Sequence, residues 1–172
     1  TYGMYLDALK QNAMMTINTG VMAVAQSMYG KTDEALRQLE IMFKTFGMAT
    51  PGSMSEMSPD YGCFVQAWTA YSVFLPIVRF FFGIEPKASE GKINVSPCMP
   101  EKWGNASLKN VKVLDGNVSV SVERNEDTVT VTVENKTSYP VTVSPSRKYQ
   151  AVENASDICA PGETAAVIYR VK

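Results

Sequence analysis

Helical periodicity marks the first half of the chain. Apolar residues recur at i, i+3, i+4 and i+7, the spacing of one face of an amphipathic helix, at Val21, Val24, Ala25 and Met28. The buried face expected for a second helix has a similar spacing: Leu36, Leu39, Met42, Phe43 and Phe46. Gly30 separates the two runs and suits the left-handed residue that ends a helix. The sequence therefore predicts an antiparallel helical hairpin within residues 4–46.

A Pro-, Gly- and Ser-rich segment, residues 48–62, interrupts this period and predicts an ordered loop. Residues 63–84 are then apolar almost throughout, which raises the question of a membrane span. Polar residues such as Gln66 and Arg79 interrupt the run, and no basic flank follows it. We therefore expect no membrane span but a helix that is buried inside a larger helical assembly and kinked or broken at Pro76.

The second half of the chain alternates with a period of two, which indicates strands. Valines separated by polar residues carry the pattern: Val111, Val113, Val118, Val120, Val122, Val129, Val131, Val133, Val141 and Val143. Asp115-Gly116 and Asn125-Glu126-Asp127 are expected turns, and 165–171 is expected as the last strand. The change of pattern near Pro86 predicts two domains, a helical one at 1–86 and an antiparallel β-sandwich at 87–172.

Composition excludes several kinds of chemistry. Among 172 residues, 16 Lys and Arg face 17 Asp and Glu, so the basic excess typical of nucleic-acid binding is missing. The chain contains no His, which excludes Ser-His and Cys-His nucleophiles and His metal ligands from this chain. Its three Cys show no CxxC spacing. We therefore expect no metal and no cofactor.

The chain begins at Thr1 without an initiator Met or a signal-type apolar stretch. We interpret it as the C-terminal piece of a longer polypeptide. The compartment stays open, with a periplasmic or secreted location favoured over the cytoplasm.

Candidate chemistry gathers around the loop. Glu56, Asp60 and Tyr61 lie in it, and Gln66 and Trp68 follow at the start of the apolar run. Carboxylate and amide groups bind sugar hydroxyls, and an indole offers a flat apolar face to a sugar ring. Each residue also has a structural explanation: a solvated loop acid, a turn former, a residue of the core, or an amide satisfied within the fold.

Three runs of residues carry a resemblance to a known family: PGSMSEM followed by GCFVQAW, then FFGIEP, then SEGKINVSPCMPEKW. The chain resembles the C-terminal end of six-hairpin glycosidases, which are (α/α)6-barrel glycoside hydrolases. It is similar to glycogen-debranching-type α-1,6-glucosidases and to α-L-rhamnosidase-like enzymes. Gln66-Ala67-Trp68 favours the glucosidase, whereas the appended sandwich favours the rhamnosidase. The implied fold is α+β and multidomain, with the last helical hairpins of the barrel followed by the sandwich.

The resemblance implies an inverting mechanism in which two carboxyl groups flank the glycosidic bond. Glu56 would be the general base, and Gln66, Trp68, Asp60 and Tyr61 would bind substrate. The general acid would come from an earlier hairpin, so the fragment alone is expected to be inactive. The implied partners are an oligosaccharide or polysaccharide and the missing N-terminal part of the same enzyme.

Two other functions remain open. The sandwich could be a carbohydrate-binding module, for which the large candidates are Trp103, Tyr139, Tyr149 and Tyr169. The chain could also be a structural or surface protein without sugar chemistry. Asn-x-Ser/Thr sequences at Asn105, Asn117, Asn135 and Asn154 would suit a secreted glycoprotein, but strands rich in these residues produce them by chance.

Overall fold

The structure, a computed structural model, describes residues 14–48, 50–58, 62–66, 69–152 and 157–172. The chain forms two compact units that divide between Pro76 and Ile77. The first unit is mainly helical and the second is made of strands. Each is described by itself below.

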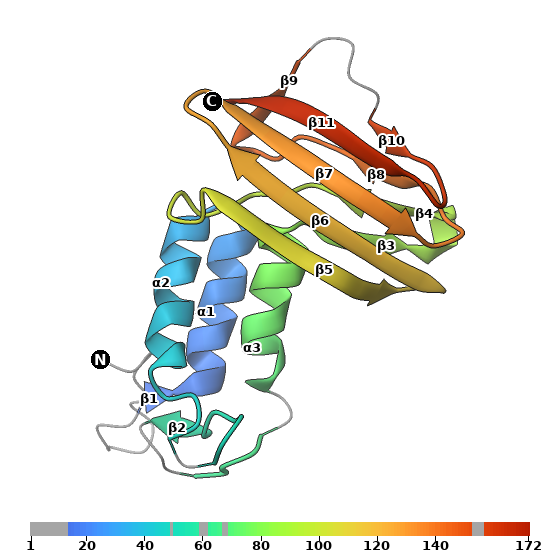
Figure 1. Cartoon of the computed structure of the whole chain (residues 1–172). Coiled ribbons are helices and arrows are strands. Elements are labelled where there is room, and N and C mark those ends of the chain that lie inside the picture. The colour runs from blue at the N-terminus through green and yellow to red at the C-terminus, as the bar shows by residue number, and fades with distance from the viewer. Residues whose placement is uncertain (1–13, 49, 59–61, 67–68, 153–156) are drawn as a thin grey trace. The chain divides into compact units, whose positions relative to one another are not determined.

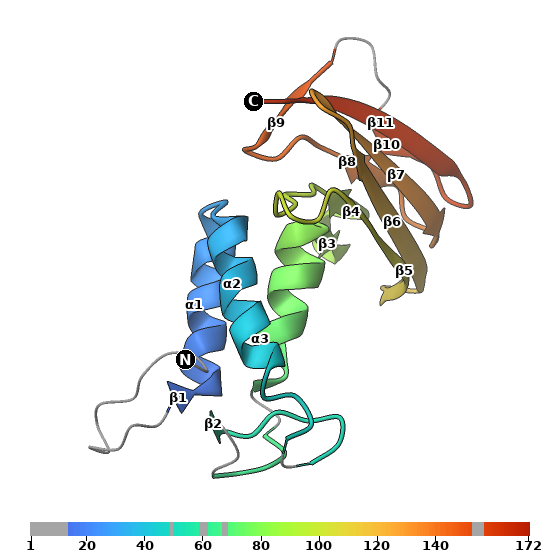
Figure 2. The ribbon, with the colours of Figure 1, turned by 60° about the vertical axis from the view of Figure 1, so that its left-hand side comes forward.

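Three helices lie side by side in the first unit (Figures 1 and 2): α1 (Thr16–Met28), α2 (Thr32–Phe43) and α3 (Tyr71–Phe74). The predicted hairpin is confirmed for α1 and α2, whereas residues 4–13 of the predicted range 4–46 lie outside the described residues. Gly30 lies between them with a φ of 75°, the left-handed conformation that ends a helix without a steric penalty. A short antiparallel pair, β1 (Met14–Met15) and β2 (Met57–Ser58), joins the start of α1 to the loop.

The first unit packs through small and aliphatic side chains. Leu36, Leu39 and Met42 on α2 are buried, as their spacing predicts. Gly20 on α1 allows close contact with α3, because a Cβ there would lie 1.9 Å from the Ser72 Oγ. Alanine at position 20 would therefore force the two helices apart.

The predicted helix over residues 63–84 is wrong in its extent. Its helical part runs from Tyr71 to Phe81 and consists of α3 and the π-helical segment η3 (Leu75–Phe81). Pro76 has no N–H to donate to an i−4 carbonyl, which explains the departure from α-helical geometry. Residues 84–87 form a strand, because their backbone pairs with a neighbouring strand.

Two sheets form the second unit, which confirms a β-sandwich. The four-stranded sheet has the order β10-β8-β4-β3 and the five-stranded sheet has the order β5-β6-β7-β11-β9 (Figure 1). The strands of the first sheet are β3 (Ile84–Lys87), β4 (Lys92–Val95), β8 (Val141–Val143) and β10 (Ile158–Cys159). Those of the second are β5 (Asn105–Val113), β6 (Gly116–Arg124), β7 (Thr128–Lys136), β9 (Tyr149–Ala151) and β11 (Thr164–Val171). A 3₁₀ turn, η4 (Ala88–Glu90), connects β3 to β4.

Alternating valines build the core of this sandwich. The inward positions of β6 and β7 are at most 1% exposed: Val118, Val120, Val122, Val129, Val131 and Val133. Ile93, Val95, Val141 and Val143 of the four-stranded sheet are equally buried. The valine pattern therefore predicted the core of this unit correctly.

Two details of the sandwich differ from the expectation. The pair β4–β8 is parallel, so the sandwich is not wholly antiparallel. The first hairpin turn consists of Leu114 and Asp115, one residue earlier than predicted, since Gly116 already pairs with Val113. Gly116 suits this place because a Cβ there would lie 2.0 Å from the Lys136 carbonyl oxygen.

A buried amide ties the end of β7 to the segments that follow it. The Asn135 side chain, fully buried, donates through Nδ2 to the carbonyls of Tyr139, Cys159 and Ala160 at 2.8, 3.2 and 3.2 Å. Its Oδ1 accepts from the N–H and the Oγ1 of Thr137 at 3.0 and 2.8 Å. A single side chain therefore makes five hydrogen-bond contacts, in which the two Nδ2 protons are shared among three carbonyl oxygens.

A charged cluster lies at the start of β3. Glu85 Oε1 accepts hydrogen bonds from Arg79 of η3 and from the Lys87 Nζ, the latter at 2.8 Å. These two cations lower the pKa of Glu85 to about 2. The cluster links the end of η3 to the first strand of the sheet.

Candidate functional site

Glu56 is held by backbone hydrogen bonds beside the N-terminal end of α1. Its N–H donates to the Cys63 carbonyl at 2.8 Å, and the Cys63 N–H donates to Glu56 Oε2 at 3.1 Å. The Thr16 N–H, at the first turn of α1, donates to the Glu56 carbonyl at 2.9 Å. The position of the carboxylate therefore depends on Thr16 and on Cys63, two residues that are distant from each other in sequence.

The segment from Gly62 to Cys63 passes close to this carboxylate. Gly62 has a φ of +81°, and a Cβ at this position would lie 2.9 Å from Glu56 Oε2 and 3.2 Å from Glu56 Cβ. Only glycine accommodates both the left-handed backbone and this approach. A larger residue would displace the carboxylate or the loop that carries it.

Glu56 is half-buried, and one of its two carboxylate oxygens is engaged by the Cys63 amide. Among the described residues, no donor to the other oxygen, Oε1, is found. A carboxylate that is anchored through one oxygen can accept a proton from a bound water molecule through the other.

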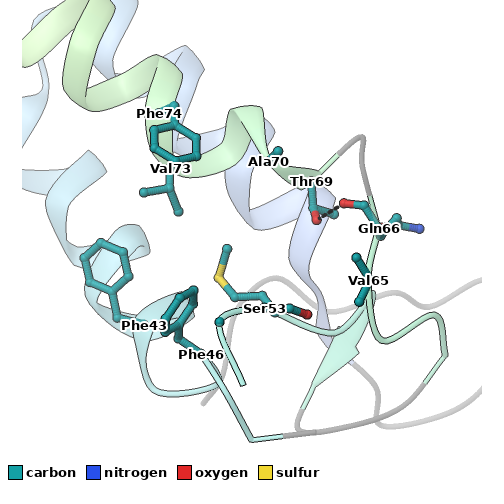
Figure 3. A pocket seen from close by; sticks show the side chains of 11 residues that line it. Phe43, Phe46, Ser53, Val65, Gln66, Thr69, Ala70, Val73 and Phe74 are labelled. Atoms are coloured by element: carbon teal, nitrogen blue, oxygen red, sulfur yellow. Dashed lines mark hydrogen bonds between the residues drawn. The ribbon is translucent and has the colours of Figure 1, made fainter. Parts of the chain in front are cut away.

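An apolar pocket of about 570 Å³ lies in the same unit, between the end of α2, the loop and α3. Figure 3 shows Phe43, Phe46 and Phe74 around one end, with Thr69 and Gln66 at the other. Gln66 lines this pocket, whereas Glu56 is not among its lining residues. That Gln66 binds the substrate on which Glu56 acts therefore remains a prediction.

The backbone around Gln66 is fixed by Thr69. The Thr69 Oγ1 donates to the Gln66 carbonyl at 2.8 Å, which orders the turn that leads into α3. The Gln66 Oε1 is buried and has no hydrogen-bond partner among the described residues. Such an acceptor could receive a hydrogen bond from a ligand hydroxyl after a small side-chain rotation.

The aromatic lining of this pocket differs from the sequence prediction. The pattern places Phe43 and Phe46 on the buried face of the expected second helix, but their exposed fractions are 40% and 56%, and Phe46 lies beyond the end of α2. Phe43 and Phe46 follow the buried positions Leu36, Leu39 and Met42 in the sequence. They line the pocket and do not pack against the neighbouring helix. The sequence did contain a signal for this pocket. The apolar residues from Leu36 to Phe46 are more than two neighbouring helices can cover.

Three predicted site residues, Asp60, Tyr61 and Trp68, lie outside the described residues. The described residues contain no group of three or more Cys, Asp or Glu side chains that could hold a metal ion. Their helices are also too short or too polar to cross a membrane.

The aromatic side chains of the sandwich are used in packing. Tyr149 and Tyr169 are each 2% exposed, and their rings stack with centroids 6.4 Å apart. Trp103 meets Phe81 edge to face at 5.5 Å. These three rings are engaged in packing, whereas Trp103 and the fourth candidate, Tyr139, are half-buried, so the binding-module function stays an untested alternative.

The β unit resembles the C-terminal domain of a carbohydrate-active enzyme. Residues 87–144 match the model for "Glycosyl hydrolase family 65, C-terminal domain". The match supports a glycoside hydrolase-like C-terminal domain over these residues and does not distinguish debranching enzymes from rhamnosidases. It ends before β9, β10 and β11.

A search of curated proteins found no match to the chain. Among solved structures, the chain is similar to a protein described as a kojibiose phosphorylase from the human microbiome, at 14% identity and a TM-score of 0.47. The match covers 87% of this chain and 17% of that one, so the chain spans a small part of the neighbour's length.

Proposed function

We propose that this chain is the C-terminal part of an enzyme that cleaves glycosidic bonds, of the α-glucosidase or debranching type, with Glu56 as its general base. The observation that carries the proposal is the match of residues 87–144 to the C-terminal domain of a glycosyl hydrolase family. The anchored carboxylate in the loop before that domain supports the assignment of the base.

In the proposed reaction, Glu56 Oε1 accepts a proton from a water molecule as the water oxygen bonds to the anomeric carbon. The bond to the leaving oxygen breaks, and a second carboxyl group protonates that oxygen. In an inverting enzyme the two groups stand about 6.5–9.5 Å apart, which leaves room for the water. The second group would belong to the N-terminal part of the enzyme, so the 172-residue chain alone should show no turnover.

Substrate contacts are part of the same proposal. The amide of Gln66 and the side chains of Asp60, Tyr61 and Trp68 would hold the sugar beside Glu56. An α-L-rhamnosidase is the second candidate, because a sandwich follows the last helical segment. A panel of α-glucosides and α-L-rhamnosides separates the two, since only one class should be turned over efficiently.

The test uses the protein that carries this segment. Glu56→Gln should lower kcat by several orders of magnitude while substrate binding is retained, because the amide keeps the shape but cannot take the proton. Glu34→Gln is the matched control, since Glu34 is an exposed acid on α2 that pairs with Arg37 at 3.9 Å. Its kcat should equal that of the wild type.

Further measurements distinguish the proposed base from other assignments. In Glu56→Ala, azide should restore turnover and give a glycosyl azide of inverted configuration, because the small anion replaces the activated water. If Glu56→Gln kept the wild-type rate, the general base would be misassigned. If cleavage required inorganic phosphate, which needs no base to become a nucleophile, the hydrolytic mechanism would be wrong.

A further inference from the structure

We infer that Thr16 is a positioning residue for the Glu56 carboxylate, an inference that rests on the proposed function. Thr16 is 2% exposed and is the first residue of α1. It is distant from Glu56 in sequence, and the sequence pattern gives no hint of the link. The structure brings the two together through the backbone of the loop.

Thr16 binds the loop at two successive carbonyls. Its Oγ1 donates to the Ser55 carbonyl at 2.6 Å, and its N–H donates to the Glu56 carbonyl at 2.9 Å. Both bonds are made by one residue of a helix, so they fix the loop backbone against a rigid element. The two peptide units that determine the direction of the Glu56 Cα–Cβ bond are therefore anchored.

The opposite side of Glu56 is fixed by the segment Gly62–Cys63. The Cys63 amide donates to Oε2, and Gly62 leaves room for this oxygen, because a Cβ at position 62 would lie 2.9 Å from it. With the backbone anchored by Thr16 and one oxygen anchored by Cys63, the remaining oxygen has a defined direction. A general base needs such a direction to meet the water proton within hydrogen-bond reach.

Under this inference, Thr16 fixes the position of the Glu56 carboxylate in addition to stabilising the fold. Thr16→Val keeps the shape of the side chain and removes the donor to Ser55. A displacement of the loop on the order of 1 Å is expected to lower kcat by about 10- to 100-fold, because misplaced groups lose near-attack geometry. KM should change by less than about threefold, since the sugar contacts are made elsewhere.

The experiment compares Thr16→Val with Thr16→Ser and Thr19→Val in the protein that carries this segment. Serine retains the hydroxyl donor and should recover most of the wild-type kcat. Thr19 is a buried threonine of the same helix whose Oγ1 donates to the Met15 carbonyl at 3.0 Å. Its valine variant should lose a comparable amount of stability and keep the wild-type kcat.

Hydrogen exchange at the Glu56 and Cys63 amides is the second readout and needs no activity. Both amides should exchange faster in Thr16→Val than in Thr19→Val, because the loop anchored by Thr16 opens more often. If Thr16→Val does not fold, Gly62→Ala tests the contact of the segment Gly62–Cys63 with the Glu56 carboxylate. This variant should lower kcat in the same way, with KM retained.

The outcomes separate the inference from the function on which it rests. If Glu56→Gln is inactive but Thr16→Val and Thr19→Val have equal kcat and equal exchange, Thr16 is merely structural and the inference is overturned. If Glu56→Gln is fully active, the proposed base is wrong, even where exchange shows that Thr16 anchors the loop. Equal kcat in Thr16→Val and Thr16→Ser would also overturn the role of the hydroxyl.

Discussion

Replacing Asn135 by alanine should strongly destabilise the β-sandwich. The change removes five hydrogen bonds, three of them buried and two partly buried, and leaves the carbonyls of Tyr139, Cys159 and Ala160 without this donor. A buried polar group left unpaired costs about 1–3 kcal/mol, but waters and small shifts recover part of that loss, so we expect about 4 kcal/mol in total. A unit of this size is stable by about 5–14 kcal/mol, so the variant should remain folded with a much lower melting temperature.

The assay is urea unfolding of the chain with pulsed alkylation of Cys98. This thiol is buried in the β unit and is 7% exposed, so its modification reports opening of that unit. Asn105→Ala is the matched control, because Asn105 is exposed and its Oδ1 accepts one hydrogen bond, from the Arg124 N–H at 3.1 Å. Its cost should stay below about 1 kcal/mol.

An aspartate at position 135 tests the chemistry of the site. Asn135→Asp keeps the shape but brings a carboxylate against three carbonyl oxygens, so at neutral pH it should be at least as harmful as alanine. Acidification should restore part of the loss, because a protonated acid regains one donor. The reasoning would be refuted if Asn135→Ala cost no more than Asn105→Ala.

Two other side chains give predictions that depend on pH. The folded pKa of Glu85, about 2, lies below its ordinary value of 4.5, so its contribution to stability is present above about pH 4.5 and is lost as the pH falls toward 2. Glu85→Gln should therefore cost about 1 kcal/mol at pH 7, after discounting for solvent screening, and almost nothing near pH 2; a gap in urea midpoint that does not depend on pH would contradict this. Burial and the charge of Asp157 raise the pKa of Tyr169 to about 12, so stability should fall between pH 10 and 12 in the wild type and not in Tyr169→Phe. At pH 7 the stability of Tyr169→Phe should equal or exceed that of the wild type, because the buried Tyr169 hydroxyl has no hydrogen-bond partner among the described residues. A clearly lower melting temperature of the variant would show that the hydroxyl has a partner.

The sandwich could be predicted from the sequence because alternation fixes which face of each strand is buried. Val118, Val120 and Val122 left no other arrangement of β6 against a core. The parallel pairing of β4 with β8 could not be predicted, since both strands are short and no local turn joins them. The strand β3 was missed for a related reason: Ile84 continues an apolar run whose composition does not distinguish helix from strand.

The candidate site was predicted only as single residues. The loop composition drew attention to Glu56, but not to Thr16, whose role depends on a contact between distant segments. Gly62 could be suspected from its residue type, yet its approach to the Glu56 carboxylate is a property of the folded loop. Hydrogen bonds from the backbone leave no trace in residue identity, so this part of a site is not visible in one sequence.

The position of β11 has a consequence for how the second unit forms. This strand comes last in the chain, yet it lies between β7 and β9 and pairs with β7 from Thr164 to Arg170. Until it is in place, β7 presents an unpaired nine-residue edge with alternating valines, which is a template for pairing with another chain. Loss of the last eight or nine residues should therefore convert a well-covered sheet into one prone to aggregate. During synthesis, the same edge stays open until β11 has emerged from the ribosome and paired with β7.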